Sequence, residues 1–88
     1  MSQNKDYKLI ILAVLHKQGE YNGIKYDNAN LVVATQKNGE YVACDFGYKC
    51  KYDDFQEIFG CSVCDVSYKE LVECYFDKFG RVCKAVLK

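Results

Sequence analysis

The chain contains no proline, only one histidine and no long hydrophobic run. The longest apolar run, Leu9 to Leu15, is much shorter than the roughly 20 residues that a membrane-spanning helix needs. No small-residue cleavage site follows this run, so we expect no secretory signal and a cytoplasmic protein. In that reducing compartment the six cysteines should be thiols unless they bind a metal.

Catalytic motifs are absent as well. His16 is the single histidine, and we interpret it as a polar strand terminus. No serine or cysteine stands in a recognisable nucleophile motif, and there is no glycine-rich phosphate loop of the P-loop or Rossmann type. We therefore expect a protein that is not an enzyme and that needs no cofactor.

What is present fits one small soluble domain spanning residues 1–88. Half of the residues are hydrophobic, and 12 basic residues balance 12 acidic ones, a composition that favours a compact fold over disorder. The balance hides a segregation, because acidic residues dominate from Asp53 to Asp77 and only basic ones follow, from Lys78 to the end. This asymmetry is compatible with a face that binds an anion, and equally with a solvated helix beside a basic strand.

The first half of the chain has the pattern of three strands. Residues 7–15 and 30–35 are apolar, β-branched runs of strand length, and residues 40–50 alternate between two faces. Asn38-Gly39 is the residue pair that favours a type I′ hairpin turn between the second and third strands. Gly47, inside the third strand, indicates a bulge or a sharp bend.

In the second half of the chain the spacing of the apolar residues changes from that of a strand to that of a helix. Residues 52–59 have helical spacing and stop at Gly60, and the capping-box pattern of residues 67–70 predicts a further helical turn. Residues 71–76 and 81–87 then flank the polar turn 77–80 as a closing hairpin.

Three strands, a helix and two further strands make a mainly β protein with the element order of the OB-fold, a small five-stranded, partly open barrel. In this arrangement the segment KQGEYNGIKYDN, residues 17–28, is a long loop between the first two strands, and residues 77–80 form the loop between the last two. Both loops flank the ligand-binding face of an OB-fold. An open α+β sheet capped by one helix is the alternative.

Two stretches carry a resemblance to a known family. The frame HKQGEYNGIKYDN after a first strand, together with the terminal YFDKFGRVCKAVLK, resembles the small single-stranded DNA-binding proteins of phages and mobile elements, including the filamentous-phage helix-destabilising type. The resemblance implies an OB-like barrel that dimerises, with Tyr21, Lys25 and Tyr26 on one nucleic-acid-binding loop. Lys78, Phe79 and Arg81 would lie on the opposite hairpin. The chain is less basic than such binders usually are.

The residue types themselves agree with this expectation. Binding a single strand without sequence preference requires cations for the phosphates and flat rings on which bases stack. Aromatic and basic residues interleave in the first loop and again at residues 48–52. On the fourth strand, either Tyr75 or its two neighbours must face outward. A core role for Tyr48 is the alternative. The candidate nucleic-acid-binding residues are Tyr21, Lys25, Tyr26, Tyr41, Tyr48, Lys49, Lys51, Tyr75, Lys78, Phe79 and Arg81.

The cysteines allow a different reading. Cys61 and Cys64 have the C-x-x-C spacing of half a zinc site, and Cys44, Cys50, Cys74 and Cys83 could supply the rest. No second C-x-x-C pair exists, so we expect structural thiols and no bound metal, with a zinc site or a redox pair as the alternatives. Cys74 and Cys83 become cross-strand neighbours if Phe76 pairs with Arg81.

Two functions of different classes follow. The first is a non-sequence-specific binder of single-stranded DNA or RNA acting as a homodimer, in replication or a related process. The second is a protein-interaction module, an inhibitor or an adaptor, that uses the tyrosine-rich loop and the acidic helix, since aromatic residues also anchor protein interfaces.

Overall fold

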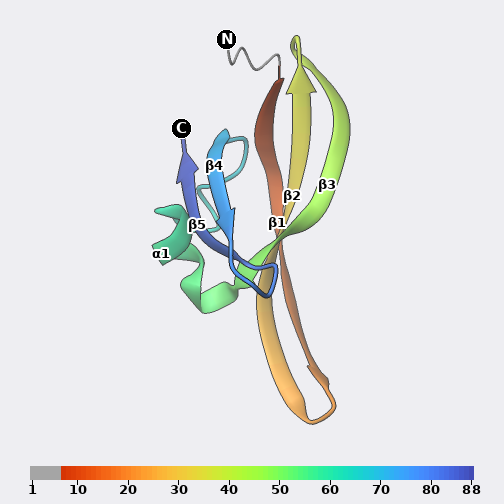
Figure 1. Cartoon of the computed structure of the whole chain (residues 1–88), viewed down its shortest axis with the longest axis vertical. Helices are drawn as coiled ribbons and strands as arrows, with labels where there is room; N and C mark the ends of the chain where they lie inside the picture. Colours follow the sequence, from red (N-terminus) through yellow and green to blue (C-terminus); the bar gives the residue numbers. More distant parts are fainter. Residues whose placement is uncertain (1–6) are drawn as a thin grey trace.

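The computed structural model describes residues 7–88, which form two antiparallel sheets and one short helical segment (Figure 1). The first sheet has the order β1-β2-β3, with β1 at Tyr7–Tyr21, β2 at Ile24–Lys37 and β3 at Glu40–Lys51. The second sheet pairs β4 (Leu71–Phe76) with β5 (Val82–Leu87). The prediction of a mainly β protein with one or two short helices is confirmed, with one short helix present among the described residues.

Two-residue turns connect the strands of the first sheet. Asn22-Gly23 joins β1 to β2, and Asn38-Gly39 joins β2 to β3. All four residues have positive φ, at 52° and 77° in the first turn and 53° and 85° in the second, as type I′ turns require. The hairpin expected at Asn38-Gly39 is therefore confirmed.

The prediction of a long loop at residues 17–28 is wrong. This segment continues β1 to Tyr21, turns at Asn22-Gly23 and continues as β2 from Ile24, with regular pairing from Leu15↔Asn30 to Tyr21↔Ile24. A loop interpretation overlooked that Asn22-Gly23 is the same turn signal as Asn38-Gly39. The polar residues of this segment are compatible with a loop, but a strand exposed on both faces carries them as well.

The bulge expected at Gly47 is confirmed. Leu31 pairs with Tyr48 and Val33 with Asp45, so that Phe46 and Gly47 together oppose the single residue between Leu31 and Val33. The amide of Gly47 donates a hydrogen bond to Oδ1 of Asp45, at 2.8 Å. The bulge bends β3 away from the line of β2 in Figure 1.

The helix expected at residues 52–59 is present as a 3₁₀ turn, η1 (Tyr52–Asp54), followed by α1 (Phe55–Phe59). Gly60 ends it in the left-handed region, with φ at 78°, and its amide donates to the carbonyl of Gln56, which closes the last turn.

The helical turn expected at residues 67–70 is absent, and this segment instead runs along the free edge of β1. The amide of Tyr68 donates to the carbonyl of Ile11 at 2.6 Å, and the amide of Ile11 donates to the carbonyl of Lys69 at 3.0 Å. Glu70 forms a β-bridge with Ile10. Main-chain hydrogen bonds with a distant strand have replaced the local hydrogen bonds of a capped helix.

The turn between β4 and β5 is where it was expected, but the register differs. Phe76 pairs with Val82, not with Arg81, and Cys74 pairs with Ala85. The predicted pairing of Cys74 with Cys83 is therefore wrong. The turn is one residue longer than predicted, because residues 77–81 separate Phe76 from Val82, and a register shift between Tyr75 and Phe76 adds a further residue on β5.

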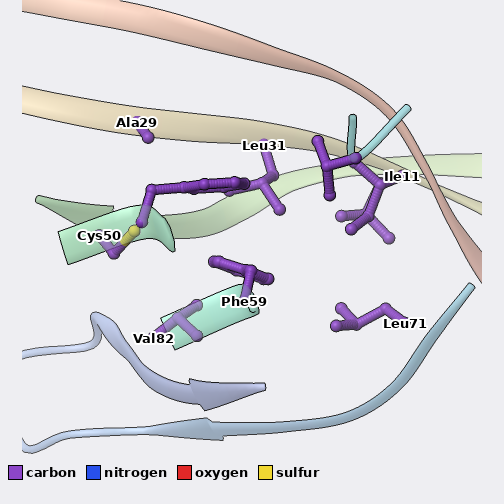
Figure 2. Close-up of a cluster of buried hydrophobic side chains, with 10 residues drawn as sticks. Ile11, Ala29, Leu31, Cys50, Phe59, Leu71 and Val82 are labelled. Atoms are coloured by element: carbon purple, nitrogen blue, oxygen red, sulfur yellow. The ribbon is translucent and has the colours of Figure 1, made fainter. Parts of the chain in front are cut away.

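One hydrophobic core joins the two sheets and α1 (Figure 2). The first sheet contributes one face, and β4, β5 and α1 pack against it. The rings of Phe55 and Phe59 stack with centroids 4.5 Å apart. The buried members are Ile11, Ala29, Leu31, Val33, Cys50, Phe55, Phe59, Val66, Leu71 and Val82.

The strands do not close into a barrel within residues 7–88, because no strand of the first sheet pairs with β4 or β5, and the isolated Ile10↔Glu70 bridge lies just before β4. The five-stranded OB-like barrel is thus not confirmed beyond its mainly β character. In the described part of the chain, no helix has the length and apolar character needed to cross a membrane.

Candidate nucleic-acid interface

The distal half of the β1–β2 hairpin, residues 15–30, projects beyond the core, and we call it the arm (Figure 1). Strand residues point alternately to two faces, and cross-strand partners share a face. The register therefore assigns every arm residue to a side. One side continues the core face through His16 and Ala29. We call the opposite side the arm face, and we include in it Lys49 and Lys51 of β3, which pair with Asn30 and Asn28.

The arm face contains basic, aromatic, aliphatic and amide side chains and one glycine, but no acid. Its members are Leu15, Lys17, Gly19, Tyr21, Ile24, Tyr26, Asn28, Asn30, Lys49 and Lys51. The acids of the arm, Glu20 and Asp27, fall on the other side, as does Lys25. A neutral chain thus has one surface on which three lysines have no acidic neighbour in the register.

The large side chains of the arm face are open to solvent. Tyr21 is 73% exposed, Ile24 71% and Tyr26 44%. Exposed apolar and aromatic groups that share one face make this face a candidate binding surface.

A hollow of about 400 Å³ lies beside the arm, where β3 ends at Lys51 and leaves the edge of β2 without a neighbouring strand. Lys25, Tyr26, Lys51 and Arg81 line it, together with the acids Asp27 and Asp53. A second hollow of about 390 Å³, lined by β5 and the helical segment, shares Lys51 and Arg81 with the first. Lys51 and Arg81 therefore lie at the boundary between the two hollows.

The base of the arm is tied to the helical segment by His16. Its Nε2 forms a hydrogen-bonded contact with Oδ1 of Asp27 across the hairpin, and its ring stacks on Tyr52 with centroids 3.6 Å apart and planes 10° apart. The interpretation of His16 as a strand terminus is wrong, since it lies in the middle of β1.

The turn between β4 and β5 presents Lys78, Phe79 and Arg81. Oδ1 of Asp77 accepts hydrogen bonds from the amides of Phe79 and Arg81, at 2.8 and 3.0 Å. The Arg81 amide, followed by that of Phe79, lowers the pKa of Asp77 below its usual value. Nζ of Lys78 lies 5.3 Å from the ring centroid of Phe79, which is 70% exposed.

Three of the candidate residues lie away from this region. Tyr41 pairs with Gln36 near the opposite end of the sheet. Tyr48 is half-buried on the core side, with its ring 5.7 Å from that of Phe76, and burial raises the pKa of its phenol. Tyr75, on β4, donates a hydrogen bond to Oε1 of Glu73 at 2.7 Å.

The structure thus brings together Lys25, Tyr26, Lys51 and Arg81 around one hollow, with Tyr21 and Lys49 on the adjoining arm face. Lys17, Gly19 and Ile24 were missed by the sequence analysis. The signal was available: once Asn22-Gly23 is read as a type I′ turn, alternation along the two strands places these residues beside Tyr21 and Tyr26.

All six cysteines are free thiols. Within residues 7–88 no three or more His, Cys, Asp or Glu side chains cluster as metal ligands. The C-x-x-C pair therefore has no second half there: Cys61 packs against the core and Cys64 is exposed.

Native alkylation should separate the thiols into two groups. Burial raises the pKa of Cys50 and of Cys74 from 9.0 to about 11, so that near pH 8 the thiolate fraction of each falls by about 100-fold. We expect iodoacetamide to label the exposed Cys44 and Cys64 well before Cys50, as followed by peptide mass spectrometry. Equal labelling rates would contradict the burial of Cys50 in the core.

No protein-family model, curated protein or solved structure matches this chain.

Proposed function

We propose that this protein binds single-stranded nucleic acid without sequence preference. The observation that carries the proposal is the arm face, where exposed Tyr21 and Tyr26 lie among lysines and no acid is present. Bases would stack on the two rings, each stack contributing about 1–3 kcal/mol, and the lysines would pair with phosphates.

The strand would continue from the arm face into the adjoining hollow. Lys51 belongs to both, and Lys25 and Arg81 also line the hollow. From Arg81 the path reaches the β4–β5 turn, where Lys78 and Phe79 offer another cation and ring. Asp27 and Asp53 in the hollow oppose phosphate binding there, which makes the arm face the principal contact.

A labelled oligo(dT), titrated by fluorescence anisotropy at several salt concentrations, tests the proposal. We expect binding at low salt that weakens steeply as salt rises, with a slope near 0.7 per neutralised phosphate. A matching oligo(U) would show whether RNA is bound equally well. No binding at low salt would refute the proposal.

The same proposal includes an OB-like arrangement of the strands and a homodimer. In an OB-fold the loop between the first two strands reaches the ligand, and here a long hairpin would do so. For the dimer, the outer edge of β3 has no partner strand among the described residues and exposes Tyr41, Val42 and Phe46. Such an edge is suited to pairing with a second copy.

That edge also supports the second candidate function, a protein-interaction module in the cytoplasm. The exposed carboxylates of η1 and α1, Asp53, Asp54 and Glu57, would then meet a partner's cations. Binding to a basic protein, together with no binding to oligo(dT) at low salt, would favour this alternative.

A further inference from the structure

The arm face has one position without a side chain, Gly19, and it lies directly opposite Tyr26. A Cβ built on Gly19 would lie 2.9 Å from Cε2 of Tyr26 and closer still to Cζ and Oη. Real Cβ atoms essentially never approach other atoms so closely. The phenol end of Tyr26 therefore occupies the space over Gly19 that any other residue would fill.

The backbone does not explain a glycine here. The glycines with positive φ are Gly23, Gly39, Gly60 and Gly80, and Gly19 is not among them. Glycine inside a strand is otherwise unfavourable, because it costs conformational entropy and packs no side chain. An aromatic ring lying across a cross-strand glycine compensates for this loss.

We infer that Gly19 is a positioning residue for Tyr26, and this role rests on the proposed function. By leaving room for the ring, Gly19 lets Tyr26 lie down along the arm instead of pointing freely into solvent. A ring that is already held loses less rotamer freedom when a base stacks on it. Tyr26 is 44% exposed against 73% for Tyr21, which agrees with a ring held against the arm.

The substitution Gly19→Ala keeps the Tyr26 ring but changes its position, so it tests the effect of the position alone. Alanine is compatible with the backbone of a strand, and the three atoms nearest to the added methyl group all belong to the movable end of Tyr26. The ring must then swing away while the arm stays intact. Gln18→Ala is the matched control, because Gln18 is the exposed neighbour on the opposite side of the arm.

Two measurements test the role. The first is the chemical shift of the Gly19 Hα protons, which the Tyr26 ring current should displace from the values seen in Tyr26→Leu. The second is the affinity for labelled oligo(dT). We expect Tyr26→Ala to weaken binding about 5- to 100-fold and Gly19→Ala about 3- to 10-fold. In the Tyr26→Ala background, Gly19→Ala should add less than about a twofold change, because the two act through one ring.

The outcomes distinguish this role from the proposed function. If the unchanged protein binds oligo(dT) but Gly19→Ala binds equally well, or if Tyr26→Leu leaves the Gly19 Hα shifts unaltered, the positioning role is overturned and the proposed function stands. If the unchanged protein does not bind at low salt, the proposed function fails and the role fails with it.

Discussion

Replacing Lys17, Lys49 and Lys51 together with glutamine is expected to lower the salt slope of oligo(dT) binding by about 2. The estimate follows from about 0.7 per phosphate contact on a single strand and three lost contacts. All three lysines are exposed on the arm face, and glutamine retains most of their aliphatic length. The measurement is the slope of log K against log salt, obtained from anisotropy titrations.

A second triple variant controls for net charge. Three other lysines, Lys8, Lys37 and Lys84, are also exposed but lie outside the arm. Lys8 and Lys37 lie at the end of the first sheet opposite the arm, and Lys84 lies on β5. Their replacement by glutamine removes the same total charge and should leave the slope nearly unchanged. An equal loss of slope in both variants would mean that binding responds to net charge and not to the arm face.

Phe55→Ala is expected to destabilise the fold by about 3–5 kcal/mol, the usual cost of removing a buried phenylalanine. Phe55 is 1% exposed and stacks on Phe59, beneath residues of both sheets. A domain of this length has a total stability of roughly 4–13 kcal/mol, so the variant should lose much of it. Urea denaturation followed by circular dichroism measures the change.

Phe79→Ala provides the matched control for this stability experiment. Phe79 is 70% exposed on the β4–β5 turn, so its replacement should change the free energy of unfolding by less than about 0.5 kcal/mol. A similar destabilisation by both variants would contradict the position of the core between the two sheets and α1.

The sequence predicted the elements whose signals are local. Asn38-Gly39 specified its hairpin, Gly47 its bulge and Gly60 the end of α1, because each depends on the backbone of a few consecutive residues. Residues 71–76 were predicted with the bounds that β4 has. The candidate site was predicted in part, since Tyr26, Lys25, Lys51 and Arg81 do meet around one hollow.

Other features depended on contacts that no short window contains. Residues 67–70 have a capping-box pattern but form no helical turn, because their main chain forms hydrogen bonds with Ile11 on β1 instead. This strand is more than fifty positions away in the chain. The register of β4 and β5 depended on a bulge that separates Cys74 from the expected partner. His16 contacts Asp27 and Tyr52, which belong to two other elements, β2 and η1.

By itself the sequence determined that residues 17–28 would be polar, aromatic and turned by glycines, and that the chain would be neutral overall. The Asn22-Gly23 pair carried the signal for a hairpin, but only the tertiary structure decided that this hairpin extends beyond the core, and which of its two faces continues the core face. The physical reason is the two-residue period of a strand: the face of each residue depends on register, and a shift by one residue would move every acid and lysine of the arm to the other side.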